Sequence, residues 1–335
     1  MGPGDSMRRR DFIGTLCGMA AAWPAMARAQ QSTGKIARIG FLGTTVGNFI
    51  TAQGYPAFLD ELKKSGFSVG HNLIIEEVSD IQDPKRFFVE AADFARSNVD
   101  VLVATGPEIT LQAAAAASQT IPIVFWAINY DPIERGYVKS LSRPGGNITG
   151  LVSLQTELAA KQVELLTQAL PGRTQLAILW DGLSVDQFAA AEHQAKSLGL
   201  NVQSLKMETP PYNFDAAFRN LSEGSPQMLL VLSSRFFSDF RARIAELAIQ
   251  QRLPTMFIFK SYVQAGGLIS YGIDPSANFR QVGFYVGKIL NGAKAADLPV
   301  EQATKFELAV NLKTAKAIGI DLTTSILLRA DEVIE

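Results

Sequence analysis

The sequence predicts an α/β protein that is built from two parallel-sheet units. From residue 35 onward, short apolar runs alternate with stretches in which apolar residues recur at helical spacing. This alternation is typical of parallel strands joined by helices that cover both faces of a sheet. About ten strands are more than one twisted sheet usually holds, and the Pro/Gly-rich stretch SRPGGNITG at 142–150 divides them. Two similar units are therefore expected.

The first unit is predicted to span residues 35–147. Its apolar runs predict strands at 36–42, 73–78, 99–104 and 121–126. Between the second and third runs, Phe87, Ala91, Phe94 and Ala95 fall at helical spacing, and the alanine run 113–117 is typical of a helix interior. The order strand, helix, strand therefore repeats through this unit.

The second unit is predicted to span residues 148–272. Its apolar runs predict strands at 148–152, 176–180, 202–205, 228–232, 255–259 and 268–271. A long helix follows, with Phe279, Val282, Val286 and Leu290 on its apolar face. If this helix returns at about 274–298 to the first unit, and 306–335 lies near the second unit or the hinge, the chain crosses between the units more than once. Such crossings predict a multi-strand hinge.

The first 29 residues are predicted to be an export signal. Arg8, Arg9 and Arg10 precede an apolar stretch at 12–23, and small residues follow at Ala27 and Ala29. The apolar part is too short to span a bilayer, and the paired arginines are similar to the twin-arginine type of signal. Cleavage is expected near Ala29, with export of the mature protein to an oxidising compartment.

The charge balance and the small set of reactive residues exclude several classes of function. The formal net charge is −1, and the chain has two histidines and one cysteine, Cys17, inside the predicted signal. A nucleic-acid surface is therefore not expected. None of the catalytic or phosphate-binding motifs that we considered occurs, so neither a cofactor nor a metal site is expected, and the protein is not predicted to be an enzyme.

Hydroxyl groups follow several of the predicted strands. Thr44 and Thr45 follow the first strand, Thr105 and Gly106 the third, and SSR at 233–235 the eighth. Ligands of open α/β sheets bind beyond the carboxyl ends of the strands, where backbone N–H groups at helix N-termini favour an anion. The alternative is that each hydroxyl is an ordinary helix cap.

Aromatic and charged residues occur at the same kind of position. The stretch IPIVFWAINYDPIERG at 121–136 begins as an apolar strand and ends with an indole, an amide, a phenol and a carboxylate. Rings beside charges of both signs suit a small zwitterion or a flat carboxylate. Each ring could instead pack in the core, and Asp131 before Pro132 could only start a turn. The predicted solute-binding residues are Thr44, Thr45, Thr105, Gly106, Trp126, Asn129, Tyr130, Asp131, Trp180, Asp181, Ser233, Ser234, Arg235, Phe259, Tyr271 and Asp274.

Several longer stretches resemble one known family. YDPIERGYVKSLSRPGGNITGL, LAILWDG, AGGLISYGID and the C-terminal NLKTAKAIGI are similar to the ABC-transporter substrate-binding proteins whose studied members bind tryptophan or tyrosine. The resemblance implies a type I periplasmic binding protein fold with two Rossmann-like lobes. It also implies a small-molecule solute, a permease and a separate ATPase subunit as partners. We expect a monomer.

The function expected from the residues and the resemblance is capture of a small solute between the two lobes, for delivery to the permease. An aromatic amino acid or aromatic carboxylate is the expected solute class. Two alternatives remain open: an exported ligand-sensing module, and an exported enzyme that uses Asp131 or Asp181 as general base. If Trp126 contacts the solute, Trp126→Ala should weaken binding more than it lowers thermal stability.

Overall fold

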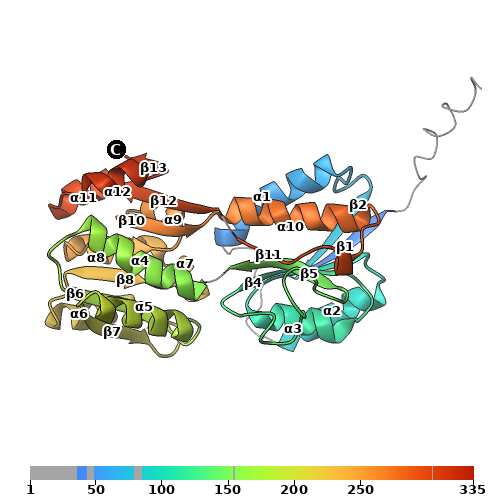
Figure 1. The fold of residues 1–335 in the computed structure, drawn as a ribbon, viewed down its shortest axis with the longest axis horizontal. Helices are drawn as coiled ribbons and strands as arrows, with labels where there is room; N and C mark the ends of the chain where they lie inside the picture. The colour runs from blue at the N-terminus through green and yellow to red at the C-terminus, as the bar shows by residue number, and fades with distance from the viewer. Residues whose placement is uncertain (1–35, 44–48, 79–84, 154, 304) are drawn as a thin grey trace, which may run out of the picture. The chain divides into compact units, whose positions relative to one another are not determined.

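The computed structural model describes residues 36–43, 49–78, 85–153, 155–303 and 305–335, and these form two sheets with flanking helices (Figure 1). The first sheet has six strands in the order β11-β5-β4-β3-β1-β2, and every neighbouring pair is parallel. Its strands are β1 (Ala37–Leu42), β2 (Leu73–Val78), β3 (Val101–Gly106), β4 (Ile123–Ile128), β5 (Ile148–Ser153) and β11 (Glu301–Gln302).

Helices cover both faces of the first sheet, as the alternation of apolar runs predicts. Helices α2 (Lys85–Arg96) and α3 (Glu108–Ala117) lie on one face, and α1 (Phe49–Lys64) and α10 (Pro275–Leu290) lie on the other (Figure 1). Because successive strand residues point to opposite faces, Phe125 joins the core under α2 and α3, whereas Trp126 joins the core under α1 and α10.

Helices α1 and α10 approach each other closely through glycine. A Cβ atom on Gly54 of α1 would lie only 2.0 Å from the Phe279 ring of α10, and one on Gly283 of α10 would lie 2.8 Å from the Phe58 carbonyl oxygen of α1. Glycine at both positions removes these clashes. The return of the late helix to the first sheet therefore depends on two residues that have no side chain.

The second sheet has seven strands in the order β13-β12-β10-β9-β8-β6-β7. It is parallel except that β12 runs antiparallel to β10. Its strands are β6 (Gln175–Asp181), β7 (Asn201–Met207), β8 (Met228–Val231), β9 (Thr255–Phe257), β10 (Ile269–Ile273), β12 (Phe306–Asn311) and β13 (Glu332–Ile334).

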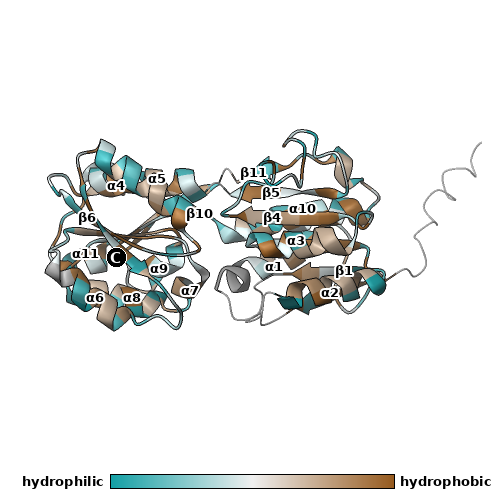
Figure 2. Cartoon of the chain, turned by 90° about the horizontal axis from the view of Figure 1, so that it is seen from below, coloured by the Kyte–Doolittle hydropathy of each residue, from teal (hydrophilic) through white to brown (hydrophobic). Residues whose placement is uncertain are grey.

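Two helix layers also cover the second sheet. Leu176 and Ile178 of β6 share a core with residues of α4 and α5, whereas Ala177 and Leu179 share another with residues of α6 and α8. Figure 2 shows hydrophobic colour on the strands and mixed colour on helices such as α6 and α8, as expected for helices with one buried face. The helices are α4 (Gln155–Ala169), α5 (Val185–Ser197), α6 (Phe214–Glu223), α7 (Arg235–Ser238), α8 (Arg241–Gln250), α9 (Lys260–Gln264), α11 (Leu312–Ile318) and α12 (Thr324–Arg329), and a 3₁₀ turn, η1 (Ala295–Asp297), follows α10.

The chain passes between the two sheets at three points. It leaves the first sheet after β5 and enters α4, returns from β10 into α10, and leaves again from β11 into β12. The sequence predicted repeated crossings, but it placed the start of the second unit at residue 148. Strand β5 pairs with β4 along its whole length, so residues 148–153 belong to the first sheet.

The strand limits also differ from those predicted. Strand β4 ends at Ile128 rather than at Trp126, and β3 ends at Gly106 rather than at Ala104. The late strands β11, β12 and β13 were not predicted, because two of them have only two or three residues. The predicted export signal lies outside the described residues.

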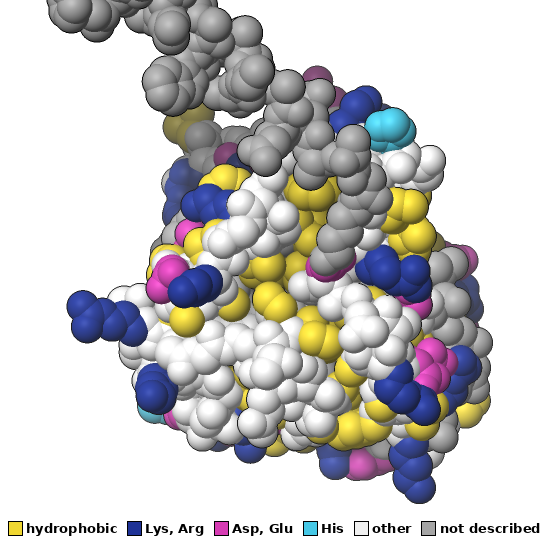
Figure 3. All heavy atoms as spheres, turned by 90° about the vertical axis from the view of Figure 1, so that its right-hand side faces the viewer, with side chains coloured by type: hydrophobic (Ala, Val, Ile, Leu, Met, Phe, Trp, Pro, Cys, Tyr) yellow, Lys and Arg dark blue, Asp and Glu magenta, His cyan; other side chains and the backbone are white. Residues whose placement is uncertain are grey.

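The described surface carries charges of both signs. On the face drawn in Figure 3, Lys and Arg side chains are scattered, and several lie beside Asp or Glu side chains. Across the part of the chain that the structure describes, no helix is long and apolar enough to cross a membrane. Over the same residues, no group of three or more His, Cys, Asp or Glu side chains is placed to hold a metal ion.

Candidate functional site

The predicted site residues of the first sheet lie at the carboxyl ends of β3 and β4. Thr105 and Gly106 close β3, and Thr105 is the register partner of Trp126 in β4. Gly106 has φ +103°, a backbone conformation that favours glycine. Thr44 and Thr45 lie outside the described residues.

Trp126 is a core residue in this structure. Only 1 % of its surface is exposed, and its ring meets the Phe279 ring edge-on at a centroid distance of 5.4 Å. The indole N–H donates a hydrogen bond of 2.7 Å to the Ser153 hydroxyl. The polar edge of the indole is therefore already paired within the protein. A solute contact at Trp126 stays a prediction, and the geometry gives the ring a packing role.

Asn129, Tyr130 and Asp131 follow β4 and have three different environments. Asn129 has φ +68°, and its side-chain oxygen is buried without a hydrogen-bond partner. The Tyr130 hydroxyl is also buried without a partner, and burial, with the nearby Tyr137 and Glu108, raises its pKa. Asp131 accepts hydrogen bonds from the backbone N–H groups of the next turn, the shorter from Ile133 at 2.7 Å. Asp131 therefore starts a turn, which was the simpler of its two interpretations.

Asp181 is the centre of a buried polar network at the carboxyl end of β6. Its side chain is 0 % exposed. One carboxylate oxygen accepts from the Tyr212 hydroxyl at 3.1 Å and from the Ser234 hydroxyl. The other accepts from the Leu183 backbone N–H at 2.9 Å and shares the Ser184 hydroxyl at 3.3 Å. The structure thus brings together Asp181 and Ser234, which the sequence predicted at separate strand ends.

Ser233 and Ser234 also support the second sheet's edge. The Ser233 backbone N–H donates to the Gln187 side-chain oxygen at 3.1 Å, which joins the end of β8 to α5. The Ser234 hydroxyl accepts from the Phe236 backbone N–H at 3.2 Å and so caps α7. Arg235 begins α7, but its side chain lies outside what the structure describes. The helix-cap interpretation of these hydroxyls is confirmed for Ser234.

Trp180 and Phe259 pack against the second sheet. The Trp180 ring stacks on Phe188 of α5 at 4.4 Å, and its N–H donates to the Ser204 hydroxyl of β7 at 2.8 Å. Trp180 therefore lies on the α5 face of the sheet, whereas the next residue, Asp181, joins the strand-end network. Phe259 is 2 % exposed and belongs to the core.

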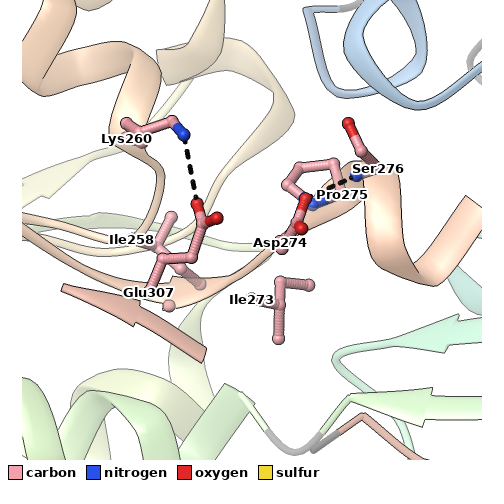
Figure 4. Close-up of a pocket in the computed structure, with 8 residues that line it drawn as sticks. Ile258, Lys260, Ile273, Asp274, Pro275, Ser276 and Glu307 are labelled. Carbon is pink, nitrogen blue, oxygen red and sulfur yellow. Dashed lines mark hydrogen bonds and ion pairs between the residues drawn. The ribbon is translucent and has the colours of Figure 1, made fainter. Parts of the chain in front are cut away.

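Asp274 lies in a pocket at the carboxyl ends of β9 and β10, which Figure 4 shows. The pocket has a volume of about 280 Å³. Asp274 caps α10 by accepting from the Ser276 backbone N–H at 2.8 Å, and its other oxygen lies 3.6 Å from the Lys305 ammonium. Lys260 lies 3.5 Å from Glu307 and 3.2 Å from Glu332. Burial lowers the pKa of Lys260, but these two carboxylates together raise it above its ordinary value.

Tyr271 lines a second pocket. The elements on both sides of two chain crossings, β5 with α4 and β11 with β12, also contribute to it. This pocket has a volume of about 480 Å³, and its lining includes Val152 of β5, Leu158 of α4, Ala303 before β12 and Phe306 of β12. The Tyr271 and Phe306 rings lie 5.9 Å apart. The Tyr271 backbone oxygen accepts from the Gln162 side chain at 2.7 Å, so α4 is tied directly to β10.

Two polar residues near these strand ends were not predicted from the sequence as site residues. Tyr212 lies in a loop before α6 with no strand next to it, and only the fold brings it to Asp181. Gln155 opens α4 and is 2 % exposed, yet neither its side-chain nitrogen nor its oxygen has a hydrogen-bond partner. A glutamine at the start of a polar helix turn gives no sequence signal of burial.

The arrangement suits noncovalent recognition. The strand ends carry a fully hydrogen-bonded carboxylate, capping hydroxyls and aromatic rings. They also carry buried amide or phenol atoms without hydrogen-bond partners on three residues, Asn129, Tyr130 and Gln155. Buried polar atoms are nearly always hydrogen-bonded in proteins, so orphaned ones at a strand-end edge are places where a ligand or water can bind.

Comparison with known proteins gives the fold and the family. A conserved domain protein from Vibrio cholerae O1 biovar El Tor str. N16961 superposes with a TM-score of 0.79 and 26% identity, covering 89% of this chain and 100% of that one. The ABC domain from Streptococcus pneumonia in complex with L-Trp has a TM-score of 0.76 and 24% identity, over 89% and 99% of the two chains. Together with more distant relatives of the periplasmic binding protein/LacI type, these structures confirm the predicted type I periplasmic binding protein fold.

Sequence comparison extends this result. The Tyrosine-binding protein of Clostridioides difficile (strain R20291) is 25% identical over 270 residues, which are 78% of this chain and 75% of that protein. The family model described as ABC transporter substrate binding protein matches residues 51–334. A match of that extent includes all three crossings and every strand of the two sheets except β1. The chain therefore belongs to the ABC transporter substrate binding protein family.

Proposed function

We propose that this protein captures a small solute between its two sheet units and delivers it to a membrane permease that is driven by a separate ATPase subunit. Family membership supports a substrate-binding role. The observation that carries the proposal is the grouping of polar and aromatic residues at the carboxyl ends of strands in two α/β units that three chain crossings connect. A clamp of this kind closes when the solute favours the closed state.

The proposed solute is an aromatic amino acid or an aromatic carboxylate. One relative is named for tyrosine, and one related structure holds L-Trp. In this chain, the Tyr212 ring lies 5.6 Å from the Phe236 ring beside the Asp181 network, which supports the same solute class. Aromatic pairs bury large areas with defined geometry, so such a wall selects flat rings.

The cellular setting is proposed from the same family role. We propose that residues 1–29 are an export signal and that the mature protein is a periplasmic monomer, which meets its permease outside the inner membrane. We propose that the lobes follow sheet membership, with residues 37–153 and 275–302 in the first lobe and 155–273 and 306–335 in the second.

Calorimetric titration tests the proposal directly. Protein that has been unfolded, stripped of ligand and refolded is titrated with L-Trp, L-Tyr, L-Phe, 4-hydroxybenzoate and, as a non-aromatic control, L-Leu. Saturable binding of an aromatic member with weaker binding of L-Leu is expected, and no binding to any member would reject the proposed solute class. Mass spectrometry of the same samples distinguishes binding from turnover, because an enzyme would generate product.

The transport role needs a second measurement. The permease and ATPase subunits are reconstituted in vesicles, and solute-loaded protein should stimulate ATP hydrolysis more than solute-free protein. Binding without such stimulation would favour the ligand-sensing alternative.

A further inference from the structure

Asp181 ties together three segments that meet at the carboxyl edge of the second sheet. Its donors come from the turn after β6, from the loop before α6 and from the residue that caps α7. These segments are far apart in sequence, since Tyr212 and Ser234 lie 31 and 53 residues from Asp181. One carboxylate therefore sets the relative positions of three loops.

The hydrogen-bonding capacity of this carboxylate is filled from within the protein. A carboxylate offers about four lone-pair sites. Tyr212 and Ser234 donate to one oxygen, while Leu183 donates and Ser184 partly donates to the other. With its side chain 0 % exposed, Asp181 has no surface at which a solute could replace these donors.

Two of the donors fix the positions of aromatic rings, one through its own side chain and the other through the helix that it caps. The Tyr212 hydroxyl is held by Asp181, so its ring is fixed at 5.6 Å from Phe236 and 5.7 Å from Phe237. Ser234 donates to Asp181 and at the same time caps α7, whose next residues are Arg235, Phe236 and Phe237. The Asp181 carboxylate thus positions Tyr212 directly and positions Phe236 through Ser234.

We propose that Asp181 is a positioning residue, and that the Tyr212–Phe236 pair it holds is the subsite for the aromatic ring of the solute. This inference rests on the proposed solute-binding function, and it assigns Asp181 a different role from the direct solute contact predicted from sequence. Tyr212 and Phe236 are each partly buried, so each ring keeps an exposed part. The two rings meet nearly edge-on at 5.6 Å, within the range of about 4.5–7 Å that aromatic rings prefer, and the exposed part of each ring is the surface at which a solute ring would pack.

Four variants test the assignment by calorimetry against L-Trp, L-Tyr and L-Leu, with thermal unfolding measured in parallel. Tyr212→Leu removes the ring, Tyr212→Phe removes only the hydroxyl, and Asp181→Asn keeps the shape of the side chain. Asp186→Asn, on the exposed side of α5, is the matched control. We expect Tyr212→Leu to weaken binding of the aromatic solute by at least tenfold, and Asp181→Asn and Tyr212→Phe to weaken it severalfold, with a smaller preference over L-Leu.

The double variant Asp181→Asn/Tyr212→Phe separates positioning from contact. If Asp181 acts through Tyr212, the double variant should lose no more affinity than the worse single variant. The inference is overturned if Asp181→Asn and Tyr212→Phe lower thermal stability but keep wild-type affinity and preference. It is also overturned if Asp181→Asn abolishes binding while both Tyr212 variants bind normally, because Asp181 would then touch the solute itself.

Failure of the inference and failure of the proposed function have different signatures. If the proposed function is wrong, the wild-type protein itself binds no aromatic solute. If only the inference is wrong, the wild-type protein binds and the Tyr212 variants bind equally well. Should Asp181→Asn fail to fold, the two Tyr212 variants still decide whether the ring subsite exists.

Discussion

At the scale of single residues, burial separates the strand-end side chains into those that pack and those that lack partners. Trp126 was predicted at a strand end from the pattern of IPIVFWAINYDPIERG, but β4 continues two residues further, and the indole is buried with its N–H on Ser153. Asn129 and Tyr130 were predicted correctly to follow the strand, and each keeps a buried polar atom without a partner. Pattern alone could not make this distinction, because it depends on where α10 places Phe279.

Trp126→Ala is expected to lower the free energy of unfolding by about 3–5 kcal/mol, because it removes a buried ring and leaves a cavity. Ser153→Ala should cost about 1 kcal/mol, since it removes only the acceptor of the indole N–H. Urea unfolding monitored by circular dichroism measures both. A large loss of solute affinity with unchanged stability in Trp126→Ala would restore the direct solute contact expected from the sequence.

Gln155 and Gln162 provide a matched pair on α4, each 2 % exposed. The Gln155 amide has no partner, whereas the Gln162 side chain donates to the Tyr271 carbonyl oxygen at 2.7 Å. Gln155→Met should therefore leave the unfolding free energy of the solute-free protein unchanged or raise it, while Gln162→Met should lower it by about 1–3 kcal/mol. Equal destabilisation by both substitutions in denaturant titrations would mean that Gln155 is paired in solution.

At the scale of elements, alternation of apolar runs predicted the strands and helices better than their limits. The sequence left the return of one late helix to the first sheet as a condition for repeated crossings, because a long apolar helix face after the last predicted strand needs a sheet to cover. The antiparallel strand β12 was not foreseen, since FELAVN has no turn signal that connects it to β10. Its place depends on hydrogen bonds to a strand that lies more than thirty residues earlier.

The start of α10 allows the cap and the ion pair of Asp274 to be separated. Asp274→Asn keeps a side-chain acceptor for the Ser276 N–H but removes the charge that faces Lys305. Because the Lys305 side chain is 69% exposed, this change should cost well under 1 kcal/mol. Asp274→Ala also removes the cap and should cost about 1 kcal/mol more in guanidinium unfolding. If the two variants are equally unstable, the ion pair matters more than the cap.

At the scale of the whole molecule, the fold of the two sheet units places most of the tyrosines where ionisation of the phenol is disfavoured. Burial raises the pKa of Tyr130, Tyr262 and Tyr285, and burial together with the hydrogen bond to Glu108 raises the pKa of Tyr137 to about 12. Four of the seven tyrosines therefore resist ionisation in the folded protein.

This protection predicts a specific alkaline behaviour. A tyrosine whose folded pKa is raised stabilises the fold fully below the unfolded pKa of about 10, and that contribution is lost as the pH rises through the folded pKa. Absorbance at 295 nm at pH 11 should therefore show ionisation of fewer than half of the tyrosines, and Tyr137 should ionise as the pH rises through about 12. Complete ionisation at pH 11 with native circular dichroism would contradict the described burial.

The sequence by itself determined the α/β class, the division into two sheet units and the resemblance to a substrate-binding family. These depend on local periodicity and on short motifs, both of which a single chain displays directly. The tertiary structure alone decided that Trp126 is core, that Asp131 starts a turn, and that Asp181 meets Tyr212 and Ser234. The physical reason is that burial and hydrogen bonding at strand ends are set by side chains from distant segments, and those distances exist only after the chain has folded.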